Sequence, residues 1–261
     1  MFRSLATAAS GMEAQQTKLD VTANNIANVS TTGFKKARAE FADLIYQQTR
    51  GAGSSTGAGT NAPNSTEVGL GVRLEATSRE HSQGELHNTG NQLDVAIQGK
   101  GYFPVTMPNG QTQYTRNGAL QMTAEGKLVT NEGYAIGGDI TIPSDAVSVT
   151  IASDGQVTAT TQSDATPQSL GQIQLATFAN PGGLEAQGTN LFRETSASGS
   201  AVLGNPGEGG AGSISQGMLE VSNVNVVEEM VDLISGQRAY EVNSRVVKAA
   251  DEMLGETAQL R

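Results

Sequence analysis

Apolar residues recur every seven positions at both ends of the chain, and almost nowhere between them. In the N-terminal part the repeat consists of Leu5, Met12, Leu19 and Ile26. In the C-terminal part it consists of Val226, Leu233, Tyr240, Val247 and Leu254. Such a repeat keeps one narrow stripe of a helix facing a partner helix. The pattern therefore predicts two terminal helices that pair with each other and with other copies of the chain.

The helix boundaries follow from capping and breaking residues. Ser4 to Asn28 contains no proline, and Thr31, Thr32 and Gly33 end this first helix. The second helix is expected to start near Ser222 or Asn225 and to run to about Leu260. Acidic residues in its early turns favour the positive end of the helix dipole. Gly236 lies inside this helix, which predicts local weakness or a close backbone approach.

The middle of the chain alternates between apolar and polar residues, as strands do. The alternating positions are 68 to 74, 93 to 97 and 147 to 151. Turn signals separate these runs at Asn109-Gly110, Asn117-Gly118, Glu125-Gly126 and Asp154-Gly155. We therefore expect a central antiparallel β domain, whose last part, Ser196 to Ser213, is Gly-rich and predicted to be a loop.

These elements predict an α+β fold in which both termini contribute to one discontinuous, coiled-coil-like helical domain. Residues 1–45 form its N-terminal part, with a short helical or extended piece from Phe34 to Tyr46. Residues 46–66 are a Gly/Ser-rich connector, flexible or irregular by composition. Residues 67–217 form the β domain, and residues 218–261 the C-terminal helical part.

Charges at the ends of the two helices favour an antiparallel pair. The basic residues after the first helix are Lys35, Lys36 and Arg38. The acidic residues at the start of the second are Glu228, Glu229 and Asp232. We predict that these two sets pair between the helices. Because an exposed pair contributes only about 0–1 kcal/mol, the pairing would set orientation more than stability. The alternative is that both sets are simply solvated.

Composition excludes several functions. The formal charge of −10 argues against nucleic-acid binding, which needs a basic surface. The absence of cysteine excludes disulfides, thiol catalysis and thiolate metal sites. No apolar run is long enough for insertion in a membrane. The first residues have no apolar core typical of a secretory signal, so we expect a cytosolic protein or one exported without removal of a leader.

No motif indicates catalysis, a cofactor or a metal. Gly53–Gly57 matches the Gly-x-Ser-x-Gly pattern of hydrolases, but it lies in the connector rather than between a strand and a helix. His81 and His87 lack a clustered carboxylate and are interpreted as solvated or hydrogen-bonded strand-end residues. We therefore expect a structural protein and no enzyme.

Several segments resemble the signatures of a known family, the rod and hook subunits of the bacterial flagellum. At the two ends these segments are Asp20–Lys35, Ser222–Val231 and Gln237–Asn243. In the middle they are Asn91–Phe103, Tyr114–Gly118 and Gly126–Thr130. The resemblance covers nearly the whole chain, with the signatures in the family's order. The length of the chain and the stretch from Gln47 to Thr66 make it most similar to the distal-rod members of this family.

The resemblance implies a subunit of the distal rod of the flagellar basal body. Its copies would form a rigid helical tube that spans the periplasm, transmits motor torque to the hook and filament, and encloses the export channel. The implied partners are copies of itself, the proximal-rod and hook proteins, the surrounding rings, and the type III apparatus that exports it uncleaved. The alternatives are a sister axial protein, proximal rod or hook, and a β-domain hydrolase or binding protein with helical dimerisation arms.

The repeat and the resemblance together indicate a set of subunit-interface residues. The three amide side chains near the end of the first helix, those of Asn24, Asn25 and Asn28, could bond to neighbouring helices or cap them. The full set is Leu5, Met12, Leu19, Asn24, Asn25, Ile26, Asn28, Val226, Met230, Leu233, Tyr240, Val247 and Leu254.

Overall fold

A computed structural model describes residues 2–53, 55–57, 60–61, 63–137, 140–162 and 166–259. Within it the chain divides into two compact units. The first comprises residues 1–27, 37–78 and 225–261, and the second comprises residues 28–36 and 79–224. The predicted fold class is confirmed, because two terminal helices accompany a central region of antiparallel strands. Among the described residues, no helix combines the length and apolar character needed to cross a membrane.

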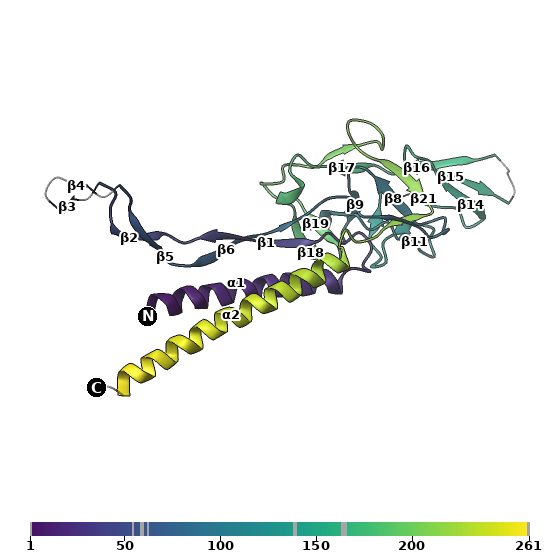
Figure 1. Cartoon of the computed structure of the whole chain (residues 1–261). Coiled ribbons are helices and arrows are strands. Elements are labelled where there is room, and N and C mark those ends of the chain that lie inside the picture. The colour runs from purple at the N-terminus through teal and green to yellow at the C-terminus, as the bar shows by residue number, and fades with distance from the viewer. Residues whose placement is uncertain are drawn as a thin grey trace. The chain divides into compact units, whose positions relative to one another are not determined.

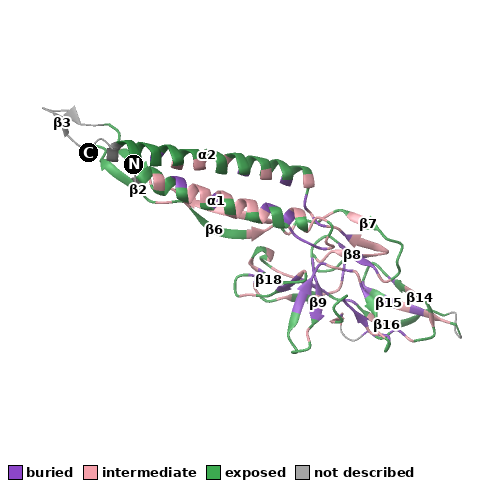
Figure 2. Ribbon diagram, turned by 90° about the horizontal axis from the view of Figure 1, so that it is seen from below, coloured by how far each residue is buried: buried purple, intermediate pink, exposed green. Residues whose placement is uncertain are grey.

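The first unit contains both helices and a two-stranded ribbon. Helix α1 spans Phe2–Ala27, and helix α2 spans Val226–Gln259. They lie side by side and run in opposite directions (Figures 1 and 2). The strands of this unit are β1 (Ala37–Asp43), β2 (Tyr46–Arg50), β3 (Ser55–Gly57), β4 (Thr60–Asn61), β5 (Thr66–Gly69) and β6 (Val72–Arg79, which ends at the boundary).

The ribbon changes the predicted domain boundaries. Strand β1 pairs with β6, and β2 pairs with β5. Residues 66–78 therefore belong to the helical unit, although their alternating pattern was expected to open the β domain at residue 67. The reason is that this alternation serves a ribbon packed against α1: the Ser10 hydroxyl accepts a hydrogen bond from the Val72 N–H at 3.4 Å. The extended alternative for 34–46 is the one observed, from residue 37 onward.

The second unit consists of short antiparallel strands. Its largest sheet has the order β11-β12-β13-β9-β10-β19-β18. These strands are β9 (Phe103–Thr106), β10 (Thr112–Thr115), β11 (Gln121–Met122), β12 (Leu128–Val129), β13 (Ala135–Ile136), β18 (Glu185–Gly188) and β19 (Leu191–Arg193). A second sheet consists of β14 (Ala146–Ile151), β15 (Gln156–Thr161) and β16 (Gln168–Gln172).

Three further strand pairs complete this unit. They join β17 (Leu175–Thr177) to β20 (Val202–Gly204), β8 (Val95–Gln98) to β21 (Ser213–Gln216), and β7 (Leu86–Asn88) to β22 (Met218–Glu220). A short 3-10 helix, η1, spans Pro181–Gly183. Because β20 lies within Ser196–Ser213, the prediction that this Gly-rich segment is only a loop is wrong. Turn-forming neighbours outnumber its strand residues Val202 and Leu203, so the sequence pattern did not reveal the strand.

The core of the second unit is aliphatic and fully enclosed. Its completely buried side chains include Val95, Ile97, Phe103, Val105, Val157, Ile173 and Leu175. A smaller aromatic cluster packs Tyr102, Tyr114 and Phe192 with Ala176 and Leu184. In the first unit, by contrast, α2 is exposed along most of its length (Figure 2). The two units therefore differ in how completely each buries its own apolar surface.

Candidate assembly surfaces

The two helices of one chain meet along the predicted stripe. An ideal Cβ at Gly236 would lie 3.0 Å from Leu19 Cδ2, and one at Gly11 would lie 3.0 Å from Asn243 Nδ2. These contacts fix an antiparallel register, because positions later in α1 meet positions earlier in α2. Gly236 therefore allows a close backbone approach, which was one of the two expectations for it. The stripe at this position faces the partner helix of its own chain.

Asn25 links α1 to α2 and to the following strand. Its side chain is buried, and its amide group donates to Glu229 Oε2 at 3.1 Å and to the Ala37 carbonyl at 2.9 Å. The side-chain Oδ1 of Asn25 accepts a hydrogen bond from the Ala37 N–H at 2.9 Å. Lys18 adds an exposed ion pair with Asp232 at 3.2 Å. A buried amide therefore sets the register at this end of the pair, and the ion pair contributes little.

Sequence reasoning predicted the wrong partners for the basic residues within the chain. Lys35 binds Glu220 at 2.6 Å, Lys36 binds Glu80 at 3.3 Å, and Arg38 binds Glu40 at 3.2 Å. The physical reason is that the chain leaves the helix after Ala27. Residues 28–36, which include Lys35 and Lys36, fold with the second unit, and Arg38 lies on strand β1. Glu228 and Glu229 occupy the first turn of α2, where their negative charges interact favourably with the positive end of the helix dipole.

Lys35 belongs instead to a buried ionic cluster that sequence reasoning missed. The Glu220 carboxylate accepts from Lys35 Nζ and from Arg116 Nε, both at 2.6 Å, and from the Gly84 N–H at 2.8 Å. Burial opposes the negative charge of Glu220, but Arg116 and Lys35 hold the pKa of its carboxyl below the usual value. All three side chains are nearly inaccessible to solvent, so the cluster ties the segment after α1 to the β strands.

The predicted interface residues of the first unit are incompletely covered within one chain. Leu5, Met12, Leu19, Ile26, Asn28, Val226, Leu233 and Val247 are only half-buried, and Asn24, Met230 and Tyr240 are exposed. Only Asn25 of this set is buried. The side chain of Leu254, like those of the Gly-x-Ser-x-Gly residues 54–57, lies outside the described residues. The contact between α1 and α2, which we call the seam, is thus only partly covered within one chain.

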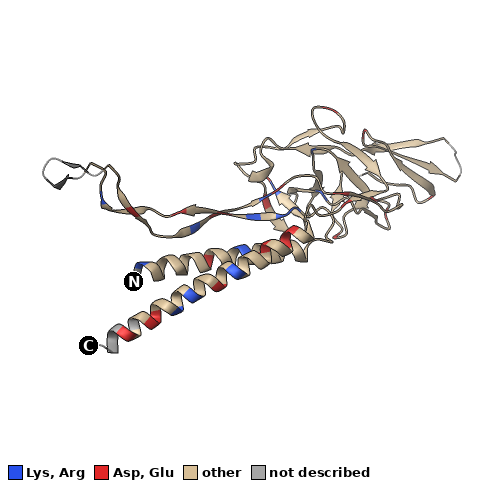
Figure 3. Cartoon of the chain, in the orientation of Figure 1, with Lys and Arg blue, Asp and Glu red and all other residues tan. Residues whose placement is uncertain are grey.

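A second apolar stripe runs along α2 and is exposed to solvent within the described part of the chain. It consists of Val227, Val231, Ile234, Val242 and Val246, which are 43–70% exposed. At 3.6 residues per turn these five positions fall within an arc of about 120°. The positions that meet α1, such as Gly236 and Asn243, lie on nearly the opposite side of the helix. Acidic and basic residues are interspersed along α2 (Figure 3). Helix α2 therefore has two apolar faces, of which the chain covers one.

The two histidines lie apart from any cluster of metal-binding groups. His81 is half-buried, and its Nδ1 lies 2.7 Å from the Tyr102 hydroxyl, whereas His87 is exposed on β7. Burial and the charges of Lys35, Arg79 and Arg116 lower the pKa of His81 to about 4. No group of three or more His, Asp or Glu side chains suited to a metal occurs within the described part of the chain.

The chain matches three families along its length. The family "Flagella basal body rod protein" matches residues 5–35, "Flagellar hook protein FlgE/F/G D1 domain" matches residues 96–159, and "Flagellar basal body rod FlgEFG protein C-terminal" matches residues 215–260. The first and last matches cover most of α1 and all of α2 up to residue 259. The helical stripes described above therefore lie within the matched segments.

Curated relatives match over the full length. "Flagellar basal-body rod protein FlgG" of Caulobacter vibrioides is 50% identical, with all of both chains covered. The protein of the same name from Bacillus subtilis is 44% identical, again with complete coverage of both. "Flagellar hook-basal body complex protein FlhP", also from Bacillus subtilis, is 31% identical over 98% of each chain. Within one organism, the chain is thus more similar to the rod protein than to the hook-basal body protein.

Proposed function

Because the chain belongs to the family of flagellar basal-body rod proteins, in its distal-rod group, we propose that its copies polymerise into a rigid helical tube. Its role is structural and not enzymatic, and it is a component of the basal-body rod. The tube would transmit motor torque to the hook and filament and enclose the export channel.

The observation that carries this proposal is the uncovered stripe on α2. Five large apolar side chains on one helix face form the kind of surface that marks a protein interface. In the proposed tube, a neighbouring copy covers this stripe with another of its surfaces. A contact of that kind joins two unlike surfaces and can therefore repeat indefinitely as an open helix.

The half-buried seam supports the same arrangement. Met230, Tyr240 and Asn24 are exposed at the edges of the helix pair, where a neighbouring pair would cover them. We propose that the whole predicted set, from Leu5 to Leu254, is completed by helices of adjacent copies. These helices would form the inner wall of the tube, and residues 46–66 would stiffen it.

The finer assignments of place and partners rest on the family alone. We propose that the chain is exported through the flagellar type III apparatus without cleavage, spans the periplasm as part of the rod, and contacts the proximal rod, the hook and the surrounding rings. These partners would meet the ends and the outer surface of the tube.

Substitution on the uncovered stripe tests polymerisation directly. Val231→Glu places a charge in the proposed contact without touching the α1 seam, and we expect it to abolish polymers and swimming while α2 stays folded. Gln237→Glu changes the net charge equally at an exposed polar position of α2 and should polymerise normally. Sedimentation, circular dichroism and a motility assay measure these outcomes. Normal polymers of the Val231→Glu protein would contradict the proposal.

A further inference from the structure

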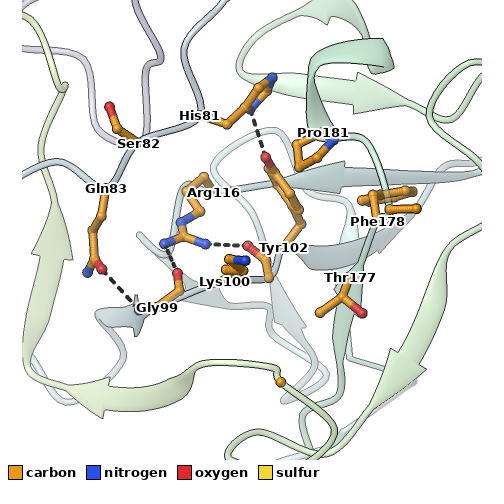
Figure 4. A pocket seen from close by; sticks show the side chains of 13 residues that line it. His81, Ser82, Gln83, Gly99, Lys100, Tyr102, Arg116, Thr177, Phe178 and Pro181 are labelled. Carbon is orange, nitrogen blue, oxygen red and sulfur yellow. Dashed lines mark hydrogen bonds between the residues drawn. The ribbon is translucent and has the colours of Figure 1, made fainter.

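A pocket of about 410 Å³ opens on the second unit beside the buried ionic cluster. Its walls come from three segments, residues 81–83, 99–102 and 177–181, together with Arg116 and Gly210. Figure 4 shows Tyr102, Phe178 and Pro181 on one side and Gln83 on the other, with Lys100 between them. The pocket is thus bounded by aromatic and aliphatic surface, and a lysine stands within its ring of residues.

Nearly every polar group around this pocket already has a partner. Arg116 donates to the Gly99 carbonyl at 2.6 Å, to the Gly101 carbonyl and to Glu220. The Gln83 amide donates to the Ile97 carbonyl at 3.1 Å and accepts from the Gly99 N–H at 3.0 Å. The remaining charged group is Lys100, which is exposed and whose ammonium has no partner among the residues that the structure describes.

The surroundings of Lys100 favour an anion. Arg116 lies in the pocket wall, and Lys35 and Arg79 lie behind it, close enough that all three disfavour a charge on His81. This positive environment occurs in a chain with 26 acidic and 16 basic residues. A locally positive pocket on an acidic protein is complementary to most of that protein's own surface.

The apolar surface continues beyond the rim. Thr177 lines the pocket, and its partner across the β17–β20 pair is Val202, which is 66% exposed. Residues directly opposite each other in an antiparallel pair project from the same face. Val202 therefore extends the apolar surface of the pocket outward, as in a contact with another macromolecule.

We propose that this pocket receives a carboxylate-bearing side chain from a second copy of this chain, with Lys100 as its pairing cation. A site for a small molecule needs several convergent polar groups. Among the described residues that line this pocket, the side-chain groups without a partner are the Lys100 ammonium and the buried Nε2 of His81, and only Lys100 carries a charge. The proposal rests on the polymerisation proposed above and specifies a contact of the β unit. Because the pocket is positive, it cannot pair with a second pocket of the same kind, so the contact joins it to an acidic surface elsewhere on the second copy.

Zero-length crosslinking with a carbodiimide tests the contact on the intact chain. This reagent joins lysine amines to carboxylates that touch them, and mixing ¹⁴N- and ¹⁵N-labelled copies identifies crosslinks between chains. We expect a crosslink from Lys100 of one copy to an Asp or Glu of another. Intermolecular crosslinks only from other lysines would overturn the pocket contact and leave polymerisation standing. No intermolecular crosslink at all would contradict both proposals.

A pair of variants measures how much the contact contributes. Lys100→Gln should raise the critical concentration for polymerisation about fivefold, as expected for loss of one partly shielded ion pair. Gln111→Glu makes the same charge change on an exposed turn outside the pocket and should leave the critical concentration unchanged. Equal critical concentrations for Lys100→Gln and the unaltered chain would overturn the proposal. Benzoate binding that requires Lys100, together with polymerisation that does not require it, would also overturn the proposal.

Discussion

Glu220 shows how individual residues tie distant segments of this chain together. Its carboxylate bridges Lys35, which follows α1, and Arg116, which follows β10. Removing one member of a buried ion pair leaves the others charged and unpaired, which costs far more than loss of an exposed pair. The cluster should therefore dominate the stability of the second unit among the ion pairs of the described residues.

Glu220→Gln should lower the free energy of unfolding by about 3 kcal/mol, because Lys35 and Arg116 would remain buried without a counter-charge. Glu185→Gln is the matched control, since Glu185 pairs with Arg193 at 2.5 Å with both side chains 48% exposed. That change should cost less than about 1 kcal/mol. Urea unfolding measures both values. Equal losses for the two variants would show that burial of the cluster does not matter.

His81 makes stability depend on pH in a definite window. The folded protein keeps His81 neutral down to about pH 4, whereas the unfolded chain takes up the proton near pH 6.5. Protons therefore bind the unfolded state preferentially between these values, and stability is lost as the pH falls from 6.5 to 4. Allowing for the partial exposure of His81, the loss attributable to it is roughly 2 kcal/mol.

His81→Gln should therefore flatten the fall in unfolding free energy between pH 6.5 and 4, while His87→Gln should preserve it, because His87 is exposed on β7. Urea unfolding at a series of pH values gives the comparison with the unaltered chain. The expectation fails if both variants retain the same slope.

At the scale of elements, Gly236 determines how closely α1 and α2 approach. A side chain at this position would press on Leu19, so Gly236→Leu should force the helices apart and lower the protection of α1 amides in hydrogen exchange. Gly255→Leu offers the control on the same helix, because no atom lies within 4 Å of an ideal Cβ there. It should preserve or raise helix content. Equal protection of α1 in the two variants would contradict this role.

The elements were predicted from sequence to different degrees. Periodicity and caps placed the ends of both helices within four residues of those observed, because their stripes are long and regular. The turn at Asp154-Gly155 joins β14 to β15 as expected, and Gly155 has a positive φ of 84°. The ribbon of β1 and β6 was missed, because its strands are separated by more than 25 residues and alternation does not reveal the partner of a strand.

The ionic cluster and the pocket were harder to predict than the helices, because their residues are also far apart in the sequence. The partners Lys35 and Glu220 are 185 residues apart in the sequence, and local charge patterns suggested nearer acidic residues of α2 instead. Asn25 bonds to Glu229 of α2 in its own chain, which is one of the outcomes left open for the amides near the end of the first helix. The pocket around Lys100 had no sequence signal beyond Gly99 and Gly101, which bring the backbone close to Gly212 and Leu175.

At the scale of the whole molecule, the two units bury their apolar surface to different extents. The second unit encloses a complete aliphatic core, whereas the first leaves a stripe of α2 and the edges of its seam uncovered. A subunit designed to stand alone would expose less of this surface. We therefore assign assembly chiefly to the helical unit. The β unit adds a secondary, electrostatic contact through Lys100.

Electron cryomicroscopy of the assembled polymer tests this assignment most directly. We expect a tube whose inner wall consists of α1–α2 pairs, with Val231 and Ile234 of each copy buried against helices of a neighbouring copy. A polymer in which this face of α2 borders solvent, or in which the β units alone hold the copies together, would contradict it.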